Sequence, residues 1–590
     1  MPSDPRTLLR SRSYLQLLVI AGALGVPVSA ASYGFLKLVD YLQQEIFTHL
    51  PHGLGFSTEP VWWPLPVLAV GGILTGLAIQ YLPGRGGASP ADGFKVHGPP
   101  TPAQLPGVFL AALATLIFGA VLGPEAPLIA LGGGLVVLAL RAARRDVPDQ
   151  ARAVLASAGA FAAISTLFGS PILGAFLLME ASGLGGPMLG LVLVPGLLAA
   201  GIGSLIFIGL NAWTGWGTFS LVIPGLPHVG SPTLGEFGWA IVIGVAAVLV
   251  GSGIRWLGRA LKPYSERQPP LAALVVGLVV AGLAIAYAEG AGKSSSEVLF
   301  SGQNALGPLI TNSATYTVGA LLLLLVCKSL AYGVSLSSFR GGPVFPALFI
   351  GSTGGIAMSH LPGLQMVAGV AMGIGAMSVV MLTLPLTSVL LATVLLFSDG
   401  LTVMPLVIVS VVVAYVGAAR LAPPPEPEPA GSAQAGSAAT AAGSAPAPGP
   451  TATPRGLPGP GITLVGGQHH AGDPRPQVTR VGAHQRHVVD GEGPFPADVT
   501  GEREPPAQHR ADPVAVAGEE ADVDEQPDPP AQEPAEVQLE RGDDGFAAGD
   551  IGGRTQVAVF ERLVEALPLG QVAGPSPGVD PGLHLSLIHI

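Results

Sequence analysis

The sequence has few charged residues and a single cysteine. Charged side chains make up 11% of the 590 residues, against 49% hydrophobic ones. A large soluble helical protein needs a polar face on each long helix, and this composition cannot supply one. The one cysteine, Cys327, excludes an intramolecular disulfide framework.

The few charges are unequally distributed. Residues 1–420 carry 18 basic and 14 acidic side chains, a net charge of +4. Residues 421–590 carry 9 basic and 24 acidic ones, a net charge of −15. The acidic balance of the whole chain therefore describes its C-terminal part and not its apolar part.

Long apolar runs fill the first 420 residues. Those of about 18 residues or more are long enough to cross a bilayer, and they occupy residues 15–38, 64–82, 105–122, 187–210, 236–257, 271–288 and 315–334. Shorter runs that begin at or near Gly or Pro occupy residues 124–140, 151–166, 171–181, 346–358, 366–381, 385–398 and 402–418. Interrupted helices survive at membrane depth only when protein or water covers the break. The pattern predicts an all-α polytopic membrane protein, at residues 15–420, that encloses a polar path.

Basic residues predict which side of the membrane the N-terminus and the loops face. Residues 1–14 hold three arginines, and the apolar stretch that follows is too long for a signal peptide. We expect a cytoplasmic N-terminal segment and a retained first helix in a bacterial cytoplasmic membrane. Two further basic groups are expected on the same side, namely Arg141, Arg144, Arg145 and Arg152, and Arg255, Arg259, Lys262 and Arg267.

The C-terminal part has a different character. Residues 421–460 are rich in Pro, Ala, Gly and Ser and are expected to form a linker. Residues 461–590 show no sustained helical or strand period, so we expect a disordered acidic tail, or a translated segment that was never selected to fold. The adjacent His469 and His470 are not expected to bind a metal.

Two stretches of the apolar part are imperfect copies. Gly-Pro-Glu-Ala-Pro-Leu-Ile-Ala-Leu-Gly at 123–132 matches Gly-Pro-Val-Phe-Pro-Ala-Leu-Phe-Ile-Gly at 342–351, and only the first carries a charge, Glu125. Each copy precedes a second shared element, at 168–173 and 382–387. We therefore predict two repeats, roughly residues 15–210 and 236–418, a plan that recurs in ion-transporting proteins.

The repeat supplies the parts of an anion site. Helix N-termini carry partial positive charge and unpaired N–H donors, so several of them aimed at one point bind an anion without Lys or Arg. Glycine permits close approach of the backbone, and proline suits the first helical turn. The residues expected around the anion are Gly86, Gly87, Ala88, Ser89, Gly123, Pro124, Ala126, Gly342, Val344 and Phe345.

Three charged residues lie within apolar runs. Glu125 would compete with the anion for the same donors and is a natural gate, although a carboxylate there can also simply cap its own helix. Glu180 either lines a proton path or lies at the membrane surface, and we favour the surface. Lys328 is expected to extend its ammonium group towards the membrane surface.

These motifs resemble the CLC family of chloride channels and chloride/proton exchangers. Residues 123–127 are similar to the family's Gly-Arg-Glu-Gly-Pro segment, residues 168–180 to its Asn-Ala-Pro-Leu-Ala-Gly helix, and residues 342–346 to Gly-x-Phe-x-Pro. The resemblance covers roughly residues 15–418. It implies two inverted repeats of tilted helices, an ion path within each subunit, Glu125 as the external gate, and a homodimer joined near residues 171–195 and 385–418.

Several positions depart from the family pattern. Gly87 stands where the family has an anion-binding serine, unless Ser89 takes that serine's role. Pro343 and Val344 stand where the family donates two backbone amides, one of which proline lacks. No tyrosine follows residue 415 to supply the family's central tyrosine, and no nucleotide-binding module follows the membrane part. Ala181 stands where exchangers commonly keep a second glutamate, so the resemblance favours a passive channel.

We therefore expect transport of chloride or another small anion across the lipid bilayer, with no cofactor, no metal and no nucleic acid. A chloride/proton or fluoride/proton antiporter is the alternative. Two readings of another class are a nonconducting membrane scaffold, which the missing serine, amide and tyrosine suggest, and a membrane-embedded enzyme that uses Glu125 and Glu180 as acid and base. The enzyme reading lacks a recognisable metal or nucleophile motif, and we do not expect catalysis.

Overall fold

The computed structural model describes residues 10–95, 98–144, 147–183, 187–223, 226–396 and 400–422. All of them belong to one compact unit within Met1–Ser444. The predicted linker, beyond its first two residues, and the predicted acidic tail lie outside the described residues. So do Arg145, His469 and His470.

Helices make up the N-terminal half of the described chain. They are α2 (Arg12–Gln44), α3 (Leu50–Gly53), α4 (Pro64–Tyr81), α5 (Leu105–Ile117), α6 (Glu125–Ala142), α7 (Asp149–Phe168), α8 (Pro171–Ser182) and α9 (Pro187–Thr214). Short helical turns occupy Glu45–His49 (η1, a π-helix) and Pro90–Asp92 (η2, a 3₁₀ turn).

The C-terminal half repeats this plan. Its helices are α10 (Leu234–Arg267), α11 (Pro269–Ala291), α12 (Gln303–Thr311), α13 (Val318–Ser338), α14 (Val344–Ser359), α15 (Met366–Leu382), α16 (Pro385–Leu395) and α17 (Gly400–Leu421). The 3₁₀ turns η3 (Ser295–Glu297) and η4 (Ser313–Thr315) lie between them. Proline opens α4, α8, α11 and α16, where its fixed φ suits the first turn and its missing N–H costs nothing.

Nine helical segments of the described chain are long and apolar enough to cross a membrane. A further five apolar helices, α5, α8, α14, α15 and α16, have only 10 to 17 residues. The prediction of long helices mixed with broken ones is therefore confirmed, and the chain is an all-α polytopic membrane protein.

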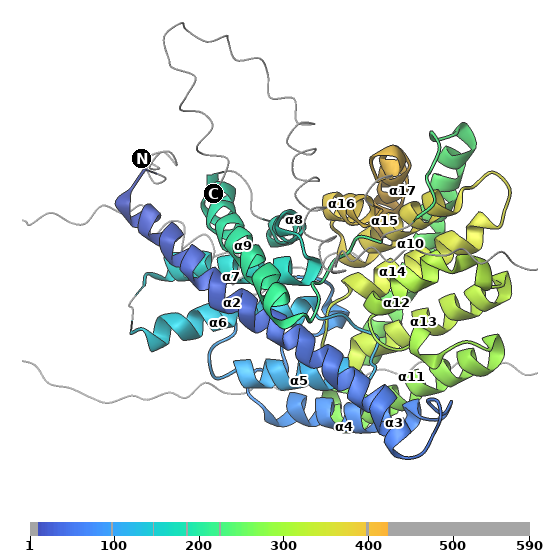
Figure 1. The fold of residues 1–590 in the computed structure, drawn as a ribbon, viewed down its shortest axis with the longest axis horizontal. Coiled ribbons are helices and arrows are strands. Elements are labelled where there is room, and N and C mark those ends of the chain that lie inside the picture. The colour runs from blue at the N-terminus through green and yellow to red at the C-terminus, as the bar shows by residue number, and fades with distance from the viewer. Residues whose placement is uncertain are drawn as a thin grey trace, which may run out of the picture. The chain divides into compact units, whose positions relative to one another are not determined.

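The two halves pack in matching ways. The helix α2 crosses α9 and α7, and α10 packs in the corresponding manner against α17 and α15 (Figure 1). The helix α4 lies along α11 and joins one half to the other. Glycines permit this close contact, because a Cβ at Gly72 or Gly76 of α4 would collide with the backbone of α11.

The predicted repeat is visible in backbone geometry. The helices α7 and α15 both end at a residue in the left-handed region, Gly169 at φ 62° and Thr383 at φ 60°, and α8 and α16 begin two residues later at a proline. Gly123 and Gly342, which open the two copies of the shared motif, exchange both backbone hydrogen bonds in an antiparallel bridge. Such a reciprocal pair is what two repeats of opposite direction produce at their shared axis, and the fold is a pair of inverted repeats.

We expect Thr383→Gly to stabilise the protein by about 1 kcal/mol, because a β-branched residue at positive φ is strained. Thr383 is exposed and its hydroxyl bonds only to the carbonyl of Leu382. The reverse change, Gly169→Thr, should destabilise the protein, since a Cβ there would collide with the carbonyl oxygen of Phe219. Thermal unfolding in detergent measures both, and a lower stability of Thr383→Gly would contradict the strain argument.

Some helix ends differ from those that the hydropathy of the sequence predicts. The run at 105–122 was expected to be one helix, but α5 ends at Ile117 and Gly119 takes φ 96°. Residues 118–124 thereby become a non-helical connection that leads from a turn at Phe118 and Gly119 to the start of α6. The short helix α12 was missed because its nine residues contain Gly307 and Pro308 and form no long apolar run.

Candidate anion pathway around Glu125

Glu125 is the first residue of α6 and is fully buried, with 0% of its surface exposed. Its Oε1 accepts a hydrogen bond of 3.0 Å from the backbone amide of Phe345, in the first turn of α14. The amide of Val344 also faces the carboxylate. Glu125 therefore does more than cap its own helix, because it bridges the N-termini of corresponding helices in the two repeats.

Only one oxygen of the Glu125 carboxylate has a hydrogen-bond partner. Its Oε2 has no hydrogen-bond partner among the described residues. The first turns of α6 and α14 place the positive ends of two helix dipoles beside it, an environment that favours negative charge. A side chain with one bonded and one unbonded oxygen is held there by few contacts, and the same donors are suited to a free anion.

Two glycines make room for this carboxylate. A Cβ at Gly342 or at Gly123 would collide with the carboxylate oxygens of Glu125. The bridge between these glycines fixes the distance between the two helix starts, with N to O distances of 2.8 and 2.6 Å. The glycine of the repeated Gly-Pro motif is thus needed at both positions, because a side chain at either one would displace the Glu125 carboxylate.

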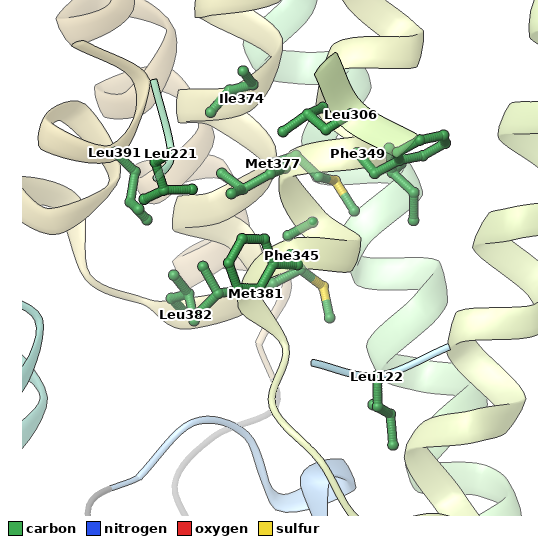
Figure 2. Close-up of a cluster of buried hydrophobic side chains, with 14 of the residues drawn as sticks. Leu122, Leu221, Leu306, Phe345, Phe349, Ile374, Met377, Met381, Leu382 and Leu391 are labelled. Atoms are coloured by element: carbon green, nitrogen blue, oxygen red, sulfur yellow. The ribbon is translucent and has the colours of Figure 1, made fainter. Parts of the chain in front are cut away.

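The surroundings of the receptor amide are apolar. Phe345 belongs to a buried cluster with Met381 and Leu382 of α15, as Figure 2 shows. The Phe168 ring at the end of α7 lies 6.0 Å from the Phe345 ring, centroid to centroid. Water has little access to this side of the site, which strengthens the electrostatic interactions of the carboxylate.

A cavity of about 440 Å³ approaches the site along the C-terminal part of α2. Its walls include Leu122 and Pro124, the latter adjacent to Glu125 in the chain, and the carboxylates of Asp40 and Glu297. Beside it, in the connection between α3 and α4, burial raises the pKa of Glu59 to about 7, and a hydrogen bond from the Ser295 hydroxyl opposes the rise. The cavity therefore reaches Pro124, the residue before Glu125, while Glu125 itself stays buried.

The turn at Gly86, Gly87, Ala88 and Ser89 is not part of the contacts around Glu125. It lies beside Arg340 rather than beside the carboxylate, because a Cβ at Gly86 would meet the Cγ of Arg340 at 3.2 Å. Gly87, where a serine was expected by resemblance, has φ 91°, a conformation that serine rarely adopts. Ala126, in the first turn of α6, forms no contact with that turn that the structure records.

Two buried polar residues near Glu125 were not predicted from the sequence. The hydroxyl of Tyr332 donates to the carbonyl oxygen of Pro343 at 3.2 Å, and that of Thr115 accepts from the amide of Arg340 at 3.1 Å. Both are fully buried and hold the chain that leads into α14. Only their position within apolar helices could have indicated such a role, and that signal is weak.

Glu180 is partly exposed and its carboxylate is bound to the start of a helix. Its carboxylate accepts hydrogen bonds from the amides of Leu386 and Thr387 at 2.9 and 2.7 Å and from the Thr387 hydroxyl at 2.6 Å. These groups form the first turn of α16, whose unpaired amides and dipole suit a carboxylate. The expected position at the membrane surface and the proton-path role both stay predictions.

We expect Glu180→Gln to lower the stability by about 2 kcal/mol, because an amide cannot accept from all three donors and hydrogen bonds to charged groups are among the stronger ones. Thr387→Val, which removes only the hydroxyl, is the matched partial change and should cost about 1 kcal/mol. Thermal unfolding in detergent measures both. An unchanged stability together with altered proton movement would instead place Glu180 on a proton path.

The prediction for Lys328 was wrong, because its ammonium group does not extend to a surface. The side chain is fully buried, and Nζ donates to the carbonyl oxygens of residues 297, 298, 299 and 300, at 2.8, 3.2, 3.0 and 3.4 Å. The Phe349 ring lies 4.3 Å from Nζ. Since Glu297, Leu299 and Phe300 line the cavity, Lys328 fixes one of its walls.

These features define an integral membrane protein of inverted-repeat architecture with a buried carboxylate between two helix N-termini. A sequence profile described as "Voltage gated chloride channel" matches residues 71–419. The chain therefore belongs to the CLC family of voltage-gated chloride channels and their relatives. Members of this family are anion transport proteins rather than enzymes.

Relatives with curated names point to ion transport. The chain is 29% identical over 365 residues to YfeO, a protein named for ion transport, from Escherichia coli (strain SMS-3-5 / SECEC), covering 60% of this chain and 81% of the relative. The YfeO of Shigella boydii serotype 4 (strain Sb227) is 28% identical over 366 residues, with the same coverage.

Solved structures share the fold. A slow cyanobacterial Cl⁻/H⁺ antiporter superimposes with a TM-score of 0.57 at 21% identity, covering 69% of this chain and 95% of that one. A CLC-type fluoride/proton antiporter gives a TM-score of 0.53 at 22% identity, covering 68% and 95%. At these identities the similarity establishes the architecture and not the transport mode.

Proposed function

We propose that this protein conducts a small anion, chloride in the first place, through a path that the carboxylate of Glu125 closes. The hydrogen bond of 3.0 Å between Glu125 Oε1 and the Phe345 amide carries the proposal, because it places the only charge of the repeated motif on the donors suited to an anion. Membership of an anion-transport family supports the same function.

The proposed gating follows from competition for donors. Ionised Glu125 occupies the first turn of α14 and excludes the anion by charge and by volume. Protonation weakens the hydrogen bond from Phe345 and removes the attraction to both helix dipoles, so the side chain leaves more readily. An anion that reaches the cavity lined by Pro124 can then take the same amides.

We propose passive conduction rather than exchange with protons. Ala181 has no titratable group, and the neighbouring Glu180 is bound to three donors of α16, which leaves it poorly placed to carry protons. The fold shared with a Cl⁻/H⁺ and a fluoride/proton antiporter supports the alternative of an exchanger.

Efflux of chloride, and separately of fluoride, from liposomes with the internal pH recorded distinguishes a channel from an exchanger, since only an exchanger moves protons in the opposite direction. No efflux of either anion would favour a nonconducting scaffold.

We further propose that the protein acts as a homodimer in a bacterial plasma membrane, with its repeats at roughly residues 15–210 and 236–418. Residues 171–195 and 385–418, where the dimer interface is expected, expose large apolar side chains in the single chain, which supports their burial against lipid or a second copy. These side chains belong to Val194, Leu386, Leu401, Ile408 and Val412.

A further inference from the structure

The helix α13 carries two buried hydroxyl groups that bond outside the helix. They belong to Tyr332 and Ser335, which are three residues apart and therefore lie on one face of α13. The hydroxyls of Ser204 in α9 and Ser352 in α14 instead bond to a carbonyl of their own helix. The two hydroxyls of α13 are thus available to hold neighbouring parts of the chain.

Ser335 holds the segment that leads to Glu125. Its Oγ accepts a hydrogen bond of 3.3 Å from the backbone amide of Val121. Val121 is fully buried in the non-helical connection between α5 and α6, where its amide has no place in a helical ladder. A buried amide outside regular structure needs such an acceptor, so Ser335 fixes this connection against α13.

Tyr332 holds the start of α14. Its hydroxyl donates to the carbonyl oxygen of Pro343 at 3.2 Å. Pro343 is the N-cap of α14, and the same carbonyl accepts the amide of Ala347 in the helix. The Phe345 amide, which donates to Glu125, follows two residues later in the first turn. Tyr332 therefore fixes the part of α14 that receives the carboxylate.

The two segments held by α13 are the ones that meet at the Gly123–Gly342 bridge. Val121 lies two residues before Gly123, and Pro343 directly follows Gly342. One face of one helix thus holds both sides of the contact between Glu125 and its donors.

This arrangement is absent from the first repeat. Tyr332 and Ser335 lie ten and seven residues before Gly342, and the residues ten and seven before Gly123 are Leu113 and Leu116. Leucine side chains form no hydrogen bonds. The hydroxyl pair therefore belongs to the repeat that receives the carboxylate, and the charge belongs to the other repeat.

Tyr332 does not act on Glu125 by direct bonding. Its hydroxyl lies within electrostatic range of the Glu125 carboxylate and of the Arg255 guanidinium of α10. The bond to Pro343 uses the only hydrogen of the hydroxyl, and Arg255 donates to the carbonyl oxygen of Val380 at 2.9 Å. Tyr332 can therefore influence the carboxylate through the position of α14.

We propose that Tyr332 and Ser335 are positioning residues of the gate, which hold the two segments at the spacing that lets Glu125 reach the Phe345 amide. The inference rests on the proposed gating by Glu125. Hydrogen bonds weaken steeply when their geometry is disturbed, so a small movement of either segment lowers the occupancy of the closed position.

The first test is chloride efflux from liposomes that contain full-length Tyr332→Phe, at a series of pH values. The substitution keeps the ring and removes one neutral hydrogen bond, so efflux at neutral pH should rise about two- to tenfold. Ionised Glu125 is then held less firmly and takes up a proton more readily. The midpoint of the pH profile should therefore move to higher pH, by up to about one pH unit. Ser335→Ala should move it in the same direction.

Two controls separate positioning from a general structural effect. Tyr33→Phe removes a hydroxyl that donates to the carbonyl oxygen of Gly217 at 3.1 Å, far in the chain from both segments, and should leave the pH profile as in wild type. Tyr332→Phe and Ser335→Ala should have no further effect on efflux in a Glu125→Gln protein, because the charge that they position is gone.

The outcomes distinguish this inference from the gating on which it rests. If Glu125→Gln changes efflux as expected while Tyr332→Phe and Ser335→Ala keep the wild-type pH profile, the positioning role is wrong and the gate stands. Effects of equal size with and without the Glu125 charge would also overturn the positioning role. A wild-type pH profile in Glu125→Gln would overturn the gate itself, and this inference with it. Should one of the two variants fail to fold, the other decides.

Discussion

Replacing Glu125 with glutamine is expected to raise chloride efflux at neutral pH about tenfold or more and to remove most of its pH dependence. Glutamine keeps the shape of the side chain but loses the charge that holds Oε1 to the Phe345 amide and to two helix N-termini. A charge-assisted hydrogen bond contributes about 1.5–3 kcal/mol, which corresponds to roughly 10- to 100-fold in occupancy of the closed position. The wild-type efflux should rise as the pH falls, because protonation does what the substitution does.

The measurement is efflux from liposomes at a series of pH values. Glu125→Ala, which removes the side chain, should behave like the glutamine variant or conduct faster. Glu289→Gln removes an exposed carboxylate near the end of α11 and serves as the matched control with wild-type behaviour. If both Glu125 variants keep the wild-type efflux and pH response, the carboxylate is a helix cap and not a gate.

Replacing Lys328 with methionine is expected to destabilise the protein by about 3 kcal/mol or more. The substitution removes the donor shared by four carbonyl groups at residues 297–300, and buried carbonyls left without a donor cost about 1–3 kcal/mol each before the chain relaxes. It also removes the contact between Nζ and the Phe349 ring. Since the freed segment lines the cavity, the wall beside Glu297 should loosen as well.

Unfolding in detergent by heat or by increasing sodium dodecyl sulfate measures this effect. Lys293→Met is the matched control, because Lys293 is only partly buried and its Nζ bonds only the Thr315 hydroxyl and faces the Tyr316 ring. We expect less than about 1 kcal/mol for the control. A Lys328→Met protein as stable as the control would mean that the carbonyl groups find other donors.

The fold was predictable because the sequence features that indicate it are either local or repeated. Apolar runs and the Gly or Pro residues that bound them place most helices to within a few residues. The two copies of the motif at 123–132 and 342–351 predicted the symmetric pair that the Gly123–Gly342 bridge forms. The end of α5 could not be read from hydropathy, because residues 118–122 stay apolar after the helix stops.

The charged residues were harder to place, because their partners are distant in the chain. The acceptors of Lys328 lie about thirty residues earlier, and the donors to Glu180 lie 206 and 207 residues later. Glu125 was singled out because only the first copy of the motif carries a charge and because the motif resembles that of the CLC family.

The most direct measurement is a crystal structure of Glu125→Ala grown with bromide, using the anomalous signal to locate the anion. We expect a bromide ion within hydrogen-bonding distance of the Phe345 amide, at the place that Glu125 Oε1 occupies in the native chain. In native crystals grown at neutral pH this position should hold no bromide. An empty position in Glu125→Ala, with the Phe345 amide bonded to protein or water, would contradict the claim that the carboxylate and the transported anion share one site.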